Sequence, residues 1–181
     1  IQALIKRRLT AVRDEIRRLG MAERILSSEK PFEEMFKMEL KNWIVKEVPP
    51  LRVMVNTGEG AYNEIIGPLI EELCAELLTP VNQENQVRCT GPVMVTYTGE
   101  NCDESGGRID VAVQVAGPVT LGNEALELRT LPGIRALSVI HIGPYHTLPL
   151  AHRAVYEYIQ EHDLEWIGPA RELYLNDPAE T

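Results

Sequence analysis

The sequence carries one pattern twice, and this internal repeat limits the possible folds more than any other feature. VPPLR at 48–52 aligns with LPGIR at 131–135, a separation of 83 residues. At the same separation GAY at 60–62 falls on GPY at 143–145, and an amphipathic segment follows each of them. A chain that repeats itself in this way is expected to build one structural unit twice.

Past the amphipathic segments the separation shortens to 77 residues, so that GPVMVTY at 91–97 matches GPARELY at 168–174. Each copy therefore predicts a strand, a Pro turn, a strand, a helix and a strand. The first copy adds another strand over 108–115, after a polar Gly-rich loop. We expect an α+β fold of two pseudo-symmetric βαββ units with antiparallel sheets and two helices.

The amphipathic segments predict helices with one apolar face each. The first face consists of Ile66, Leu69, Ile70, Leu73 and Leu77, and the second of Leu148, Ala151, Val155, Tyr158 and Ile159. We expect the two units to pair their sheets and to carry both helices on one side.

The two copies form one expected domain over 42–181, with the first copy at 42–117 and the second at 124–181. The counterpart of the strand at 108–115 would begin at residue 185 (108 plus 77), beyond the end of the sequence. A domain without its last strand would leave an open sheet edge, so we expect the natural protein to continue.

Residues 1–28 have the spacing of a heptad helix. Apolar residues fall at alternating steps of four and three, through Leu9, Val12, Ile16 and Leu19. This spacing fits a long N-terminal coiled-coil helix that pairs two copies of the chain, and it equally fits an amphipathic helix docked on its own domain. SSEKP breaks the pattern, so we expect a linker over 29–41 with a short helix over 32–41.

Composition favours a cytoplasmic protein. No apolar run is long enough to cross a membrane. The number of cysteines is odd and their spacing is not that of metal ligands, which predicts reduced thiols at Cys74, Cys89 and Cys102. The formal net charge is −9; residues 1–28 hold seven Lys/Arg against three Asp/Glu, so the remainder carries −13 (−9 minus +4). An acidic body argues against wrapping nucleic acid and favours cationic ligands.

We expect neither a metal nor a cofactor nor a catalytic group. The four histidines are not spaced as metal ligands with the cysteines, and the sequence contains neither a phosphate loop nor a nucleophile elbow.

Glu172 is the strongest single indication of a binding site, because it is a charged residue within an apolar strand. The period of a strand places Glu172 and Tyr174 on one face, and the repeat matches Glu172 with Val95, so packing does not require a charge there. Glu172 on a solvated face is one interpretation; we favour a carboxylate that faces a ligand.

Aromatic residues at matched positions support a site for a flat, lipophilic cation around Glu172. They are Tyr62 with Tyr145, and Tyr97 with Tyr174. Trp166, just ahead of the strand, is either a wall of the same site or a hydrophobic plug.

IHIGPYHTL at 140–148 and GPARELYLNDP at 168–178 together resemble the GyrI-like effector-binding domain of bacterial transcription regulators, the multidrug-sensing type that follows MerR-family DNA-binding domains. The resemblance covers roughly residues 42–181 and implies an SHV2-type sensor fold with a ligand cleft between two βαββ units. It implies that Glu172 is the acidic residue that contacts the drug, and that the tyrosines named above line the cleft. The helix over 1–28 resembles the dimerisation helix of MerR-type regulators, so DNA binding would belong to an N-terminal domain absent from this sequence.

Three functions follow as alternatives. The first is a ligand sensor that binds an aromatic cation and is not an enzyme. The second is a GyrI-like hydrolase of strained, cyclopropane-bearing toxins, in which Glu172 activates water. The third is an interaction module whose cleft is filled by its own side chains or by a partner segment. The related haem-binding fold is disfavoured, because no histidine is placed convincingly in the cleft.

Overall fold

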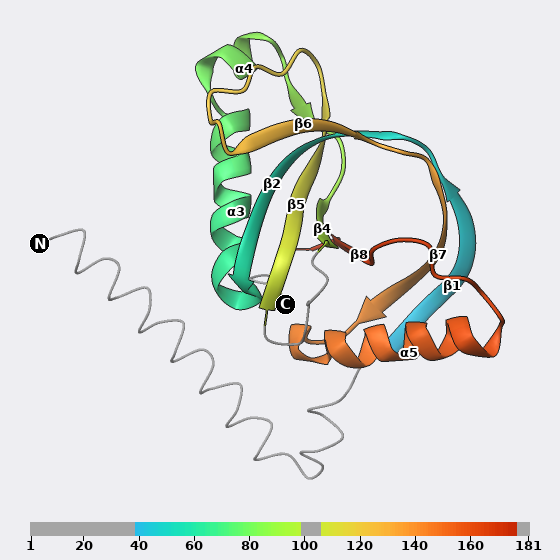
Figure 1. Cartoon of the computed structure of the whole chain (residues 1–181). Coiled ribbons are helices and arrows are strands. Elements are labelled where there is room, and N and C mark those ends of the chain that lie inside the picture. The colour runs from blue at the N-terminus through green and yellow to red at the C-terminus, as the bar shows by residue number, and fades with distance from the viewer. Residues whose placement is uncertain (1–38, 99–105, 177–181) are drawn as a thin grey trace, which may run out of the picture. The chain divides into compact units, whose positions relative to one another are not determined.

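The computed structural model describes residues 39–98 and 106–176 (Figure 1). The chain divides into two compact units: unit 1 includes residues 1–44 and 138–162, and unit 2 includes 45–137 and 163–181. The elements, in order, are β1 (Glu39–Val48), β2 (Leu51–Ala61), α3 (Tyr62–Leu77), α4 (Pro80–Glu84), β3 (Arg88–Cys89), β4 (Val93–Tyr97), β5 (Gly106–Ala116), β6 (Leu126–Leu131), β7 (Ile134–Ile142), the 3₁₀ helix η1 (Tyr145–Thr147), α5 (Leu148–Glu161) and β8 (Arg171–Tyr174).

The fold is α+β with antiparallel sheets, as the sequence predicts, and the order strand, strand, helix, strand occurs in both halves of the chain. The two halves pair with each other: β2 pairs with β6, β4 with β8 and β1 with β7. Each Pro turn therefore leads from a strand of one sheet to a strand of another sheet. In the part of the chain that the structure describes, no helix is long and apolar enough to cross a membrane.

The end of the expected linker and short helix over 29–41 differs from the prediction. Residues 39–41 belong to β1, which begins at Glu39. The preceding residues, including the heptad segment 1–28, lie outside the described residues.

Unit 2 is organised around a six-stranded sheet in which β6, β2, β5, β4 and β8 follow one another and β3 pairs with β5 (Figure 1). Alternate residues of β5 face opposite sides of this sheet. Ile109, Val111 and Val113 belong to the large apolar cluster that includes Leu73 of α3, and we call this side the α3 face. Ala112 belongs to a smaller cluster with Val53, Val55 and Met94 on the other side, which we call the opposite face.

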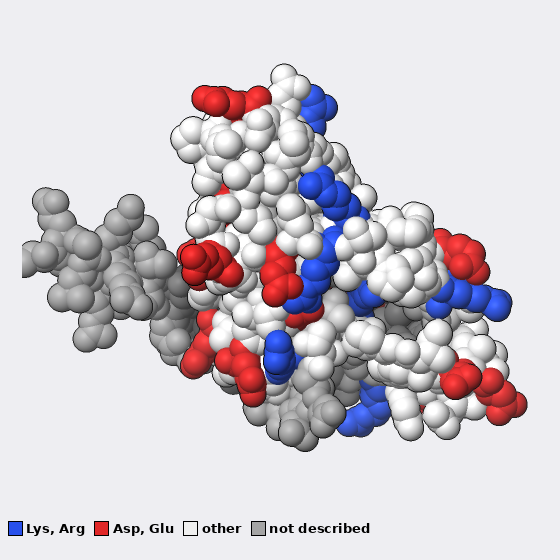
Figure 2. All heavy atoms as spheres, turned by 45° about the horizontal axis from the view of Figure 1, so that its top comes forward, with Lys and Arg blue, Asp and Glu red and all other residues white. Residues whose placement is uncertain are grey.

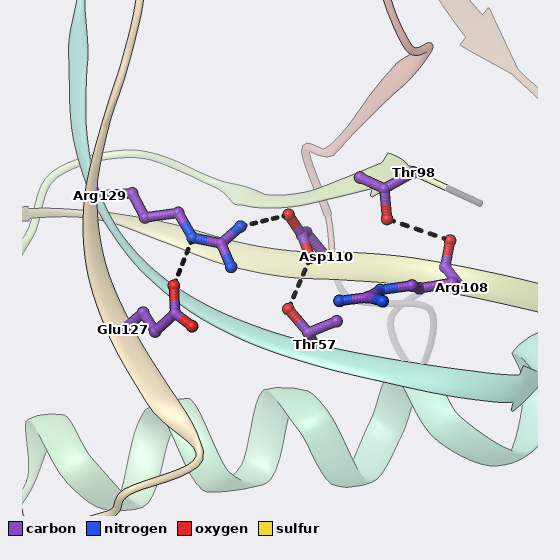
Figure 3. A network of polar contacts seen from close by, with 6 residues as sticks. All are labelled: Thr57, Thr98, Arg108, Asp110, Glu127 and Arg129. Atoms are coloured by element: carbon purple, nitrogen blue, oxygen red, sulfur yellow. Dashed lines mark hydrogen bonds and ion pairs between the residues drawn. The ribbon is translucent and has the colours of Figure 1, made fainter. Parts of the chain in front are cut away.

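A polar network on the opposite face ties three strands together (Figure 3). Arg129 of β6 forms an ion pair with Asp110 of β5 at 2.6 Å, and it also bonds Glu127 at 2.7 Å. The hydroxyl of Thr57 of β2 donates to the other oxygen of Asp110 at 2.6 Å. Both oxygens of Asp110 are therefore occupied, and the network holds β6 and β5 across the intervening β2.

Buried polar groups hold the loop between β5 and β6 against the end of α3. Glu76, 6% exposed, accepts hydrogen bonds from the backbone N–H of Gly122 at 2.6 Å and of Asn123 at 3.2 Å. Asn82, which is fully buried, donates to the carbonyl oxygens of Glu76 and Thr120 and accepts from the N–H of Thr120. One amide thus satisfies three backbone groups.

Asn82→Ala should lower the free energy of unfolding by about 2 kcal/mol, because it removes three hydrogen bonds and leaves the N–H and carbonyl oxygen of Thr120 without the partner that Asn82 supplies. Urea unfolding followed by circular dichroism measures the loss. Asn85→Ala is the matched control, since the side chain of Asn85 makes a single hydrogen bond, to the carbonyl oxygen of Pro118. Equal losses in the two variants would contradict the structural role of Asn82.

Unit 1 contains α5 and the paired ends of β1 and β7. The ring of Trp43 in β1 stacks on Tyr158 of α5 with a centroid distance of 4.6 Å, and Tyr158 stacks on His162 at 3.9 Å. At the end of η1, Thr147 is fully buried, and its hydroxyl donates to the carbonyl oxygen of Pro144 and bonds Nε2 of His141. These contacts fix the helix against the strand pair.

Candidate functional site

The site begins with the pairing of β4 and β8. The antiparallel register sets Val95 opposite Glu172 and Val93 opposite Tyr174. Val95 and Glu172 are also the residues that the 77-residue repeat matches, so each is both the repeat counterpart and the strand partner of the other. This coincidence is what a local two-fold axis between the strands requires. Tyr97 and Tyr174 therefore stand on either side of the Val95–Glu172 pair.

Glu172 points to the α3 face. Its strand partner Val95 is fully buried in the cluster of that face, and Tyr174 packs against the same cluster. The hydroxyl of Tyr174 donates to Oε2 of Glu172 at 3.1 Å, so the two side chains share a face as the strand period predicts. The side chain of Glu172 is half-buried.

Tyr97 completes the surroundings of Glu172. Burial raises the pKa of Tyr97 well above its usual value, and the charge of Glu172 and a hydrogen bond to it act in the same direction. The neutral phenol of Tyr97 is therefore a persistent donor toward the carboxylate. Tyr62 meets Tyr97 edge to face, with a centroid distance of 5.4 Å and an interplanar angle of 85°. This is a favoured arrangement for two aromatic rings.

Close backbone packing fixes the start of α3, where Tyr62 is located. Ala61 pairs with Gly106 at the end of the β2–β5 ladder, immediately before Tyr62. A Cβ atom on Gly106 would collide with the carbonyl oxygen of Gly60, so only glycine permits this approach. We call Glu172, Tyr174, Tyr97 and Tyr62 the tyrosine–carboxylate cluster.

The raised pKa of Tyr97 predicts a stability change at alkaline pH. A tyrosine in the unfolded chain ionises near pH 10, whereas folded Tyr97 keeps its proton to higher pH. The unfolded state then binds fewer protons, so the stabilisation is complete below about pH 10 and is lost as the pH rises above it. Between about pH 10 and 11.5 the unfolding free energy should fall more steeply in the wild type than in Tyr97→Phe. Tyr156→Phe, at an exposed tyrosine, should follow the wild type; equal slopes for all three would contradict the placement of Tyr97.

The other two predicted aromatic residues are Tyr145 and Trp166. Tyr145 lies in η1 of unit 1 and is 40% exposed. Trp166 precedes β8 in unit 2 and is 48% exposed, and it makes no ring stack or hydrogen bond with any described residue. The contacts described above therefore join four of the predicted residues, all within unit 2.

Figure 2 shows acidic side chains near the basic ones over the drawn face, without a broad area that is basic alone. Among the described residues, no group of three or more His, Cys, Asp or Glu side chains could hold a metal ion.

An antiparallel sheet with a carboxylate among tyrosine rings on its helix-covered face defines a domain suited to a small organic molecule. A family model for the GyrI-like small molecule binding domain matches residues 42–181, and the chain belongs to this family. A search of curated proteins found no match.

Two solved structures have a similar fold. A chain in the cryo-EM structure of an EcmrR–DNA complex, in EcmrR-RPo, superposes with a TM-score of 0.63 at 20% identity, over 96% of this chain and 64% of that one. The crystal structure of the EcmrR C-terminal domain gives a TM-score of 0.60 at 19% identity, over 79% of this chain and 86% of that one. The chain thus spans less than two thirds of the length of the EcmrR chain in the DNA complex.

Proposed function

We propose that this chain is the ligand-sensing part of a transcription regulator and that the tyrosine–carboxylate cluster binds an aromatic, lipophilic cation. The observation that carries the proposal is the setting of Glu172: a half-buried carboxylate that Tyr174 and Tyr97 hold by hydrogen bonds, with Tyr62 against Tyr97. The GyrI-like family is one of small molecule binding domains, which supports the same site.

The chemistry of the cluster selects for both charge and aromatic area. A cation close to Glu172 gains a charge-assisted contact, and the faces of the tyrosine rings attract a cation further. A neutral molecule of the same shape gains the apolar contact alone. The acidic balance of the chain, −9 overall, adds a general attraction for cations that weakens with salt.

A matched pair of dyes tests the proposal. N-methylacridinium carries a fixed positive charge, and acridine at pH 8 is its uncharged counterpart of nearly the same shape. Fluorescence titration of the chain should give a dissociation constant about tenfold or more lower for the cation, which corresponds to about 1.4 kcal/mol. Equal affinity for the two dyes would remove the role of the carboxylate.

The same samples separate a sensor from an enzyme. A sensor returns the dye unchanged, whereas a hydrolase that uses Glu172 to activate water would convert many equivalents of an electrophilic substrate. Mass spectrometry after long incubation with N-methylacridinium and with strained cyclopropane-bearing compounds should show starting material alone. Multiple turnovers would establish the hydrolase instead.

The regulator part of the proposal concerns residues outside the described ones. We propose that residues 1–28 pair two copies of the chain and connect them to DNA-binding heads, because their heptad spacing fits a coiled coil and because EcmrR, of similar fold, occurs in a complex with DNA. Sedimentation of the full chain should show a dimer that Val12→Glu dissociates. Tyr145 and Trp166 are proposed as further ring contacts for the ligand, because both rings are exposed.

A further inference from the structure

Arg171 lies beside Glu172 in sequence but on the opposite face of the sheet. Side chains alternate along β8, so Arg171 and Leu173 face away from the side on which Glu172 and Tyr174 lie. The register sets Arg171 opposite Thr96 of β4, whose own partner in β5 is Asp110. Arg171 therefore ends a row of polar side chains that crosses the sheet.

One N–H of the guanidinium of Arg171, that of Nε, is buried without an acceptor. No described residue forms a hydrogen bond with this Nε atom. A buried N–H of a charged group without an acceptor is costly, so native structures almost always supply one. The missing acceptor is the feature that needs an explanation.

The carboxylate in the same row does not supply it. Asp110 uses one oxygen for the hydroxyl of Thr57 and the other for the guanidinium of Arg129, each at 2.6 Å (Figure 3). Glu172, the neighbour along the strand, is on the α3 face and is bonded by tyrosines. Neither of these two side chains therefore provides an acceptor for Nε of Arg171.

Two neighbours of Arg171 define what kind of acceptor fits. The backbone N–H of Tyr97 bonds the carbonyl oxygen of Ala170, so the adjacent pair, Thr96 with Arg171, is the non-hydrogen-bonded type in which side chains lie closest. The hydroxyl of Thr96 can donate to the same anion as the guanidinium. Leu173, next on this face, is 49% exposed and offers apolar contact.

We propose that Arg171 and Thr96 form a second ligand site, on the opposite face of the sheet, for a carboxylate that is attached to an apolar group. The guanidinium and the hydroxyl bind the carboxylate, and Leu173 contacts the apolar part. A planar guanidinium binds a carboxylate by two parallel hydrogen bonds, so this geometry favours a carboxylate over a spherical anion such as chloride. The site is independent of the tyrosine–carboxylate cluster, which takes a cation on the other face.

Calorimetric titration of the full chain with benzoate tests the proposal, with benzamide as the uncharged probe of the same shape. Benzoate should bind at least tenfold more tightly than benzamide. Arg171→Gln should weaken benzoate binding at least tenfold, and Thr96→Val by a smaller factor. Arg88→Gln removes the same charge from an exposed strand residue, and Glu172→Gln alters the proposed cation site; both should bind benzoate as the wild type does.

Competition experiments identify the source of the carboxylate. A blocked Leu-Glu-Leu tripeptide represents an acidic side chain of a protein segment, and benzoate represents a free organic acid. If one of the two probes binds more tightly, and Arg171→Gln weakens its binding at least tenfold, the result supports the site. The tighter probe then shows whether the carboxylate comes from a protein segment or from a free organic acid. Binding no tighter than that of chloride or formate means an adventitious ion only, and it overturns the proposal.

A second measurement does not depend on the choice of probe. In buffer without organic anions, Arg171→Met should leave the urea midpoint of unfolding unchanged or raise it, because the substitution removes a buried donor that lacks an acceptor. A clear drop in the midpoint would show that Arg171 has its partner within the chain, and it would overturn the proposal.

Discussion

Glu172→Gln should raise the dissociation constant for N-methylacridinium by about 10- to 100-fold and leave that for acridine nearly unchanged. The substitution keeps the size of the side chain and an oxygen that accepts from Tyr174, so the cluster keeps its shape. It removes the charge and with it the attraction for the cation, and the expected change of about 10- to 100-fold corresponds to about 1.4–2.8 kcal/mol.

Glu71→Gln is the matched control, because Glu71 is an exposed glutamate of α3 and its loss changes the net charge by the same amount. If Glu71→Gln weakens the binding of N-methylacridinium as much as Glu172→Gln does, the attraction comes from the net charge of the chain and the cluster is not the site. The thermal midpoints of both variants should lie close to that of the wild type, which separates a loss of affinity from a loss of folded protein.

Much of the fold could be predicted because it follows from short-range periodicity repeated at a fixed separation. The apolar spacing after GAY at 60–62 predicts α3, and the strand expected over 108–115 is β5 (Gly106–Ala116). The two-residue period places Glu172 and Tyr174 on one face, where the structure shows a hydrogen bond. In each of these cases the physical cause acts within one element.

The remainder depends on contacts between residues distant in sequence. Glu76 would be assigned to the solvated face of its helix, yet it is buried, because two backbone N–H groups of the loop 46 and 47 residues later bind its carboxylate. Thr57, Asp110 and Arg129 form one network from three strands, and no local pattern relates them. The sequence places Arg171 next to Glu172 and shows no partner for it, whereas the register of β4 and β8 sets it opposite Thr96, on the other face from Glu172.

The largest loss of stability is expected for Leu73→Ala. Leu73 is fully buried between α3 and the sheet, where its cluster includes Val95, the strand partner of Glu172. Truncation removes apolar contact and leaves a cavity, which together cost about 3–5 kcal/mol for a leucine at such a position. That is a large fraction of the total stability of a domain of this size. Urea unfolding at 25 °C measures the change.

Leu78→Ala is the control, because Leu78 is at the end of the same helix but 67% exposed, and its truncation should cost less than about 1 kcal/mol. Similar losses in both variants would show that Leu73 does not dock α3.

Leu73 has no direct role in the proposed cation site. Leu73→Ala should therefore reduce the amplitude of the dye titration in proportion to the folded fraction, while the dissociation constant of the folded molecules stays the same. Glu172→Gln should show the reverse, with full amplitude and a higher dissociation constant. The two variants therefore distinguish the helix that supports the cluster from the carboxylate that selects the ligand.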